Sequence, residues 1–128
     1  MATAANMICD GQTTASADLS SKQFHFVKLS GADTVDVCSA VTDVPFGVLQ
    51  NNPAQGEAAI VCQFGTSKVV ADATLAAGDV IGTSADGQAQ PLTVGTETTV
   101  FTCGQARTAA SAGETVSAFI NISTGRAA

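Results

Sequence analysis

The stretch Pro45–Asp72 reads PFGVLQNNPAQGEAAIVCQFGTSKVVAD, and it decides the fold that the sequence predicts. Phe46–Gln50 is a short run rich in β-forming residues, and Asn51–Gly56 is dense in residues that set turn dihedrals. Glu57–Phe64 alternates like a half-buried strand, and a turn at Gly65–Ser67 separates it from a third apolar run. We therefore expect three strands in close succession here.

Further strands are expected on both sides of this stretch. Their ranges are Gln23–Leu29, Thr34–Cys38, Val80–Thr83, Ala89–Val94, Glu97–Ala106 and Glu114–Ser123. A turn at Ser30–Asp33 makes the first two a hairpin, and Asp86-Gly87 is typical of a two-residue hairpin turn. Pro91 indicates an edge position for its strand. Frequent turn signals and the lack of a long helical stripe predict an all-β fold, a small antiparallel β-sandwich or β-barrel.

Composition limits the classes of partner. The chain has 128 residues, enough for one domain, and is 45% hydrophobic with no Trp and no Tyr. Charged residues make up only 12%, and the net charge is -6. The five basic residues are scattered, whereas phosphate binding needs a clustered basic face, so nucleic acid is excluded as an expected partner. A surface poor in charge suggests that another protein covers part of it.

The first residues look different from the rest. Met1–Ser21 holds little apolar material beyond Met7, Ile8 and Leu19, so we expect an extended N-terminal arm with one short strand near Asn6–Cys9. Residues 22–128 are then a single β domain. The arm carries no Lys or Arg and no continuous apolar run, and no stretch reaches the length of a membrane span. Synthesis in the cytosol, with no membrane partner, is the expectation.

The four cysteines do not form a metal-binding pattern. Cys9, Cys38, Cys62 and Cys103 are spread along the chain with no CxxC spacing. Cys62 is in register with Ile60 and Phe64, and Cys103 with Phe101, which favours free thiols acting as small core residues. One or two disulfides are the alternative, and a metal site is a weaker one.

A search for chemistry finds little. The only histidine, His25, lies between Phe24 and Phe26 within a strand, so a structural role is preferred over that of a catalytic base. Most acidic residues fall in or beside turns, and the glycines form no phosphate-binding loop. Lys68 lacks both the Walker spacing and the hairpin-tip setting of a biotin or lipoyl carrier. An enzyme is disfavoured, and no catalytic residue, metal or cofactor is expected.

The segment PFGVLQNNPAQGEAAIVCQFGTSKVVADATLAAGD, Pro45–Asp79, resembles the small capsid decoration, or cement, proteins of tailed bacteriophages. Looser similarity extends to FHFVKLSGADTVDVC near the start and to ARTAASAGETVSAFINI near the end, about four-fifths of the chain in all. The long polar arm before Lys22 and the cysteines at strand positions depart from the pattern. The resemblance implies a β-tulip-like fold and a non-enzymatic protein on the outer surface of a phage head.

By this resemblance, the partners are the major capsid protein and two further copies in a homotrimer, and the protein stabilises contacts between capsid subunits. Apolar residues on both faces of Gln23–Leu29 also indicate that one monomer cannot cover its own strand. Met7, Ile8, Phe24 and Phe26 are the expected contact residues for capsid or trimer. The alternatives are a β-sandwich binding module for glycans or receptors, which would normally carry exposed Trp or Tyr, and a small β-barrel hydrolase.

Overall fold

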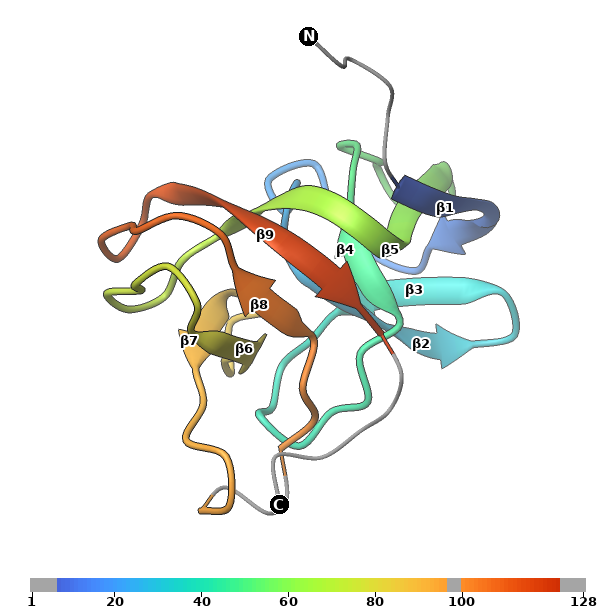
Figure 1. Ribbon diagram of the computed structural model, residues 1–128. Helices are drawn as coiled ribbons and strands as arrows, with labels where there is room; N and C mark the ends of the chain where they lie inside the picture. The colour runs from blue at the N-terminus through green and yellow to red at the C-terminus, as the bar shows by residue number, and fades with distance from the viewer. Residues whose placement is uncertain (1–6, 97–99, 123–128) are drawn as a thin grey trace, which may run out of the picture.

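The computed structural model describes residues 7–96 and 100–122, which form nine strands in one mixed sheet with no helix among them (Figure 1). The strands are β1 (Met7–Ala15), β2 (Phe26–Gly31), β3 (Thr34–Val37), β4 (Gly47–Leu49), β5 (Ala58–Val70), β6 (Val80–Thr83), β7 (Ala89–Pro91), β8 (Gly104–Ala106) and β9 (Thr115–Asn121). The predicted all-β class is therefore confirmed.

The first five strands close on themselves. The sheet runs in the order β1-β3-β2-β4-β5, and an additional pairing joins β1 directly to β5. This pairing is antiparallel and extends from Met7 opposite Gly65 to Thr14 opposite Ala58. We call this closed set the first ring. Its one parallel step, between β1 and β3, departs from the predicted antiparallel sheet.

The remaining strands continue from the far end of β5. The order β5-β9-β8-β6-β7 ends near its own beginning, because Ala89 at the start of β7 forms a parallel bridge with Ala71 just after β5. The Asp72 N–H also donates to the Ala89 carbonyl at 2.8 Å. We call this set the second ring. The 13-residue strand β5 is shared by both rings and arches across the upper part of the molecule in Figure 1.

Each ring has its own core. The first core holds seven buried aliphatic residues: Ala15, Leu19, Val27, Val35, Leu49, Ala59 and Val61. The second core is larger and includes Phe26, Val48, Val69, Ile81, Val116, Ala118, Ile120 and the cysteines Cys38, Cys62 and Cys103. Successive residues of a strand point to opposite faces, so Phe26 and Val27 are both fully buried, one in each core. This monomer therefore covers both faces of β2 at this point, which removes the sequence-based argument for a trimer.

Two expectations about the central stretch need correction. No turn interrupts the chain at Gly65–Ser67, because β5 continues to Val70 and Gly65 absorbs a bend with φ of +117°. Ile60 and Phe64 are exposed rather than buried, because the core face of β5 here carries Ala59 and Val61. Cys62 is buried as expected, because it lies on the face of β5 opposite Val61 and packs in the second core.

The extended N-terminal arm is not confirmed. β1 begins at Met7 and pairs along β5, while Ala15 and Leu19 are buried in the first core. The expectation that this segment has too few apolar residues to order against its own domain overlooked backbone pairing, which needs no apolar side chains. Residues 1–6 lie outside the described part of the chain. The proposed domain boundary before Lys22 stays a prediction.

Most of the other expected elements are present with shifted ends. The hairpin of β2 and β3, the hairpin of β6 and β7, and the edge position of Pro91 are confirmed. The predicted two-residue turn at Asp86-Gly87 is wrong, because the connection is longer: Thr83 is the last β6 residue paired with β7, opposite Ala89, and the Ser84 N–H donates to the Gln88 carbonyl at 2.7 Å. Gln23–Leu29 is wrong at its start, because Phe24 has φ of +65° and β2 begins only at Phe26. In the predicted strand Glu97–Ala106 only β8 is a named strand, and residues 97–99 are outside the described part.

Candidate interaction surface

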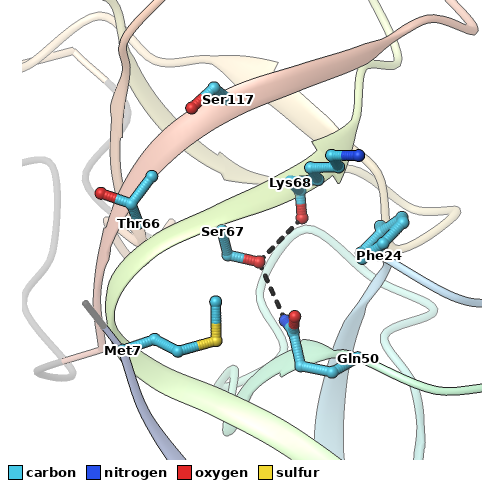
Figure 2. Close-up of a pocket in the computed structure, with 7 residues that line it drawn as sticks. All are labelled: Met7, Phe24, Gln50, Thr66, Ser67, Lys68 and Ser117. Carbon is cyan, nitrogen blue, oxygen red and sulfur yellow. Dashed lines mark hydrogen bonds between the residues drawn. The ribbon is translucent and has the colours of Figure 1, made fainter. Parts of the chain in front are cut away.

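A pocket of about 400 Å³ lies beside β5, where the two rings meet (Figure 2). Its lining comes from the start of β1, the turn before β2, the residue after β4, β5 and β9: Met7, Phe24, Gln50, Thr66, Ser67, Lys68 and Ser117. The surface that these residues present is mostly apolar. The pocket therefore suits an apolar group better than a phosphate or a sugar.

One edge of β5 is open at this pocket. β1 covers that edge only as far as Gly65, whereas β9 covers the opposite edge as far as Val70. The Val70 N–H donates to the Phe24 carbonyl at 3.1 Å and so points away from β9. Alternate residues of a strand direct their N–H groups to the same edge, so those of Thr66 and Lys68 also point into this gap. An extended segment of another chain could add here by backbone hydrogen bonding.

The polar side chains at the base of the pocket satisfy one another. The Gln50 Nε2 amide donates to Ser67 Oγ at 2.8 Å and to the Val48 carbonyl at 3.0 Å. Ser67 Oγ in turn donates to the Lys68 carbonyl at 3.0 Å. Figure 2 shows Ser67 at the centre of this network. These groups hold the wall of the pocket in place and supply no nucleophile paired with a base.

Phe24 forms one side of the pocket in an unusual backbone conformation. Its φ of +65° lies in the left-handed region, which costs a non-glycine residue on the order of 1 kcal/mol. The conformation is held by the Phe24 N–H, which donates to the Leu49 carbonyl at 2.7 Å. The Lys68 ammonium lies 6.0 Å from the centroid of the Phe24 ring, at the outer limit of a cation–π contact.

Three exposed apolar side chains continue this surface across the sheet. Ile8 of β1 is the direct partner of Phe64 of β5, and the Phe64 and Phe119 rings pack edge to face with centroids 5.3 Å apart. Their exposed fractions are 64% for Ile8, 46% for Phe64 and 38% for Phe119. We call Ile8 and the two phenylalanines Phe64 and Phe119 the aromatic row, after the two packed rings that form most of it. Large apolar side chains gathered in this way on a surface mark a site of protein contact.

The expected contact residues are only partly brought together. Met7 and Phe24 line the same pocket, and Ile8 lies in the aromatic row next to Met7. Phe26 is 0% exposed and belongs to the second core. Sequence reasoning missed Phe64 and Phe119 as surface residues. The alternation of β5 could have revealed Phe64, because it leaves Ile60 and Phe64 together on the face opposite Ala59 and Val61. The alternation of β9 could likewise have revealed Phe119, which lies opposite the buried Ala118 and Ile120.

His25 has a structural setting. Its Nδ1 lies 3.1 Å from the Gln23 carbonyl and its Nε2 lies 3.3 Å from the Gln88 side-chain amide. Both contacts are satisfied when Nδ1 carries the proton and Nε2 accepts. Burial lowers the pKa of His25, and the nearby Lys22 lowers it further, although the Gln23 carbonyl acts against this shift. His25 is thus held as a neutral ring bridging the turns before β2 and β7.

Within residues 7–96 and 100–122, no cluster of three or more His, Cys, Asp or Glu side chains is arranged to hold a metal ion. No helix in that part of the chain could span a membrane. The only ion pair found there joins Lys28 Nζ to Asp43 Oδ2 at 3.0 Å. Asp43 also accepts the N–H groups of Ser39 and Ala40, so this carboxylate organises the loop before β4.

Comparison with solved structures finds the same fold in two phage assemblies. One match is the head fiber gp8.5 N base of bacteriophage phi29, with a TM-score of 0.67, 23% sequence identity, and coverage of 92% of this chain and 97% of that one. The other comes from the capsid of Myoviridae phage XM1, with a TM-score of 0.65, 16% identity, and coverage of 94% of this chain and 87% of that one. No protein-family model matches the sequence, and no curated protein does. The predicted resemblance to phage capsid proteins is thus confirmed at the level of the fold.

Proposed function

We propose that this chain is a non-enzymatic decoration protein, which binds the outer surface of a phage head and stabilises contacts between major capsid protein subunits. The observation that carries the proposal is the fold, shared over more than nine-tenths of the chain with a head fiber base and with a capsid structure. The low charge of the chain is compatible with this role, because burying such a surface between capsid subunits costs little desolvation. The protein would be made in the host cytoplasm and reside on the virion.

The aromatic row and the adjoining pocket are the proposed contact with the major capsid protein. The row offers apolar area, and the open edge of β5 offers backbone donors to an extended capsid segment. Met7, Ile8 and Phe24 remain proposed contact residues, whereas the burial of Phe26 assigns it to the core. Each copy binds modestly, and many copies around a closed shell add up.

A homotrimer at local three-fold positions is part of the same proposal. It rests on the family resemblance alone, since β2 is covered within the monomer. Sedimentation of the free protein, and a particle reconstruction with the protein in place, measure this directly. Copies that make no contact with one another on the particle would exclude the trimer and leave capsid binding intact.

The test of capsid binding uses heads that lack the protein, taken from the phage that encodes it. Purified protein should sediment with these heads at a saturating, repeated copy number. The double variant Phe64→Ser, Phe119→Ser should bind at least about tenfold more weakly, since it removes two aromatic contacts. The matched control is Leu29→Ser, Val94→Ser, which removes two apolar side chains that are exposed elsewhere.

Two results would contradict the proposal. Failure of the folded protein to sediment with heads would remove the decoration role. Equal loss of binding in the control pair would show that the aromatic row is not the contact. The second candidate is the alternative from the sequence, a β-sandwich binding module for receptors or glycans. Binding of a glycan by the free protein would support that candidate, although the chain has no Trp or Tyr platform.

A further inference from the structure

Two cysteines face each other across the β1–β5 pairing that closes the first ring, which we call the seam. Cys9 of β1 and Cys62 of β5 are direct partners in the antiparallel pairing of these strands. Their positions in the sequence are far apart, and no short motif links them. The seam therefore carries a pair of thiols at the one place where the N-terminal strand is joined to the centre of the sheet.

The spacing of such partners suits a disulfide bond. Directly opposed residues of antiparallel strands have Cα atoms about 4.5 to 5.5 Å apart, and disulfides join Cα atoms that are about 4.4 to 6.8 Å apart. All four cysteines are free in this structure. Cys38 and Cys103 are both buried in the second core, and neither is a register partner of another cysteine.

The two thiols of the seam differ in access to solvent. Cys9 is exposed, which corrects the expectation that all four cysteines are core residues, whereas Cys62 is buried. Burial, together with the charge and hydrogen bonding of the neighbouring Cys9 thiol, raises the pKa of Cys62 to about 11. Burial also raises the pKa of Cys38 to about 12 and that of Cys103 strongly. Only Cys9 is open to attack by a dissolved oxidant.

We propose that Cys9 and Cys62 form an oxidative lock, in which a cross-strand disulfide joins β1 to β5 and fixes the first ring in its closed form. The oxidant is a low-molecular-weight disulfide. The Cys9 thiolate attacks one sulfur of the oxidant, forming a mixed disulfide and releasing one thiol. The Cys62 thiolate then attacks Cys9 Sγ, forming the protein disulfide and releasing the second thiol. Two protein thiols are oxidised, one small disulfide is reduced, and no other reactant is needed.

The lock does not depend on the proposed capsid role, and its test uses the free protein. It would extend that role in one respect: a protein on a phage head leaves the reducing cytosol when the host cell lyses, so the seam would close covalently only after assembly. A reduced β1 can still adjust during binding, whereas an oxidised one cannot leave β5.

The experiment incubates the folded protein with oxidised glutathione, then alkylates the remaining thiols and measures intact and peptide masses. The number of free thiols should fall from four to two, with one peptide pair joining Cys9 to Cys62. Amide hydrogen exchange in β1 should slow, and the midpoint of thermal unfolding should rise by about 5 °C or more, a shift reversed by reduction.

The controls separate this lock from general thiol oxidation. Cys9→Ser, at an exposed position, should keep its other three thiols free and show no rise in the unfolding midpoint. Cys38→Ala should still form the Cys9 to Cys62 link. Glutathione that stays on Cys9 as a mixed disulfide would overturn the proposal, because Cys62 would then be unable to reach it. Links involving Cys38 or Cys103, or a Cys9 that remains unmodified, would overturn it equally.

Discussion

The two rings share β5 but are closed in different ways. The first ring is sealed by a long strand pairing between β1 and β5 around a core of seven small and medium aliphatic residues. The second ring is sealed by the single bridge between Ala71 and Ala89, around a core of fifteen residues. The ring with the longer closing strand pairing thus has the smaller core, and the ring closed by a single bridge has the larger one. A ring with a small core depends on its backbone pairing, and a ring with a large core depends on its side chains.

Removal of β1 tests this difference with the largest expected effect. Deletion of residues 1–15 opens the first ring and exposes the edge of β5 from Ala58 to Gly65. We expect the truncated chain to lose most of its stability, which for a domain of this size is about 5 to 15 kcal/mol in total. Circular dichroism during thermal unfolding measures the loss. Deletion of residues 1–6 is the control, because it leaves every described β1 pair in place.

The predicted single β domain of residues 22–128 implies the reverse result, namely a domain that folds without Met1–Ser21. A truncated chain that melts at the temperature of the full chain would restore that expectation. It would also show that the second ring and the remaining strands of the first ring suffice for the fold. The domain boundary before Lys22 would then stand.

In the second ring, the backbones of β8 and β9 approach each other closely at Gly104. A Cβ atom at this position would collide with the backbone carbonyl of Phe119 in β9, and the φ of +144° disfavours any side chain. We expect Gly104→Ala to cost at least about 3 kcal/mol in unfolding free energy, from overpacking together with backbone strain. Chemical denaturation provides the measurement.

Gly11→Ala is the matched control for this variant. Gly11 lies in β1 with no atom near the added methyl group and no positive φ. It should leave the unfolding free energy within about 0.5 kcal/mol of the parent. If Gly104→Ala were equally harmless, the β8–β9 contact would be looser than the structure has it, and the second ring would not depend on close packing there.

Local patterns in the sequence predicted most of the strands but not the rings. The β6–β7 hairpin followed from Asp86-Gly87, and β9 followed from the alternation of Val116, Ala118 and Ile120. Ring closure by β1 could not be predicted this way, because MICDGQTTA has no apolar alternation and pairs through its backbone. The register of two strands far apart in the sequence depends on both strands, so it cannot be read from the residues of one strand alone.

The candidate surface was predictable only in part. Met7, Ile8 and Phe24 were predicted as contact residues, and in the structure Ile8 is exposed, whereas Met7 and Phe24 are half-buried. Phe26 was misassigned because two apolar faces on one strand were taken to need a partner chain. Two cores within one monomer meet the same need. A single sequence cannot distinguish these cases, since both bury the same side chains.

Leu19 tests the first core with an intermediate effect. It is fully buried on the connection between β1 and β2, where its N–H donates to the Pro53 carbonyl at 2.9 Å. Leu19→Ala should cost about 3 kcal/mol through lost burial and the cavity that remains. Ile60→Ala, at an exposed position of β5, should cost much less. Equal costs would mean that the first core contributes little and that backbone pairing alone holds the ring.

The junction between the rings provides the smallest expected effect, through His25. Its Nε2 contacts Gln88 in the β6–β7 connection, and the neighbouring Phe26 N–H donates to the Gly87 carbonyl at 2.7 Å. The β6–β7 connection of the second ring thus packs against the start of β2 in the first ring. A charged imidazole is disfavoured there by burial, so folding lowers the pKa of His25 below its usual value of about 6.5.

The sign of the pH dependence follows from this shift. The unfolded chain binds the His25 proton more readily than the folded chain, so the His25 contribution to stability is complete above about pH 6.5 and is lost as the pH falls toward the folded pKa. His25→Gln keeps a hydrogen-bonding side chain without a titrating group. At neutral pH it should cost about 1 kcal/mol, and it should flatten the dependence on pH between about 7 and 5. Denaturation midpoints of parent and variant across this range measure both effects. If the parent were as stable at pH 5 as at pH 7, the imidazole would be free to charge in the folded state, and the contact between the rings at Gln88 would have to be open.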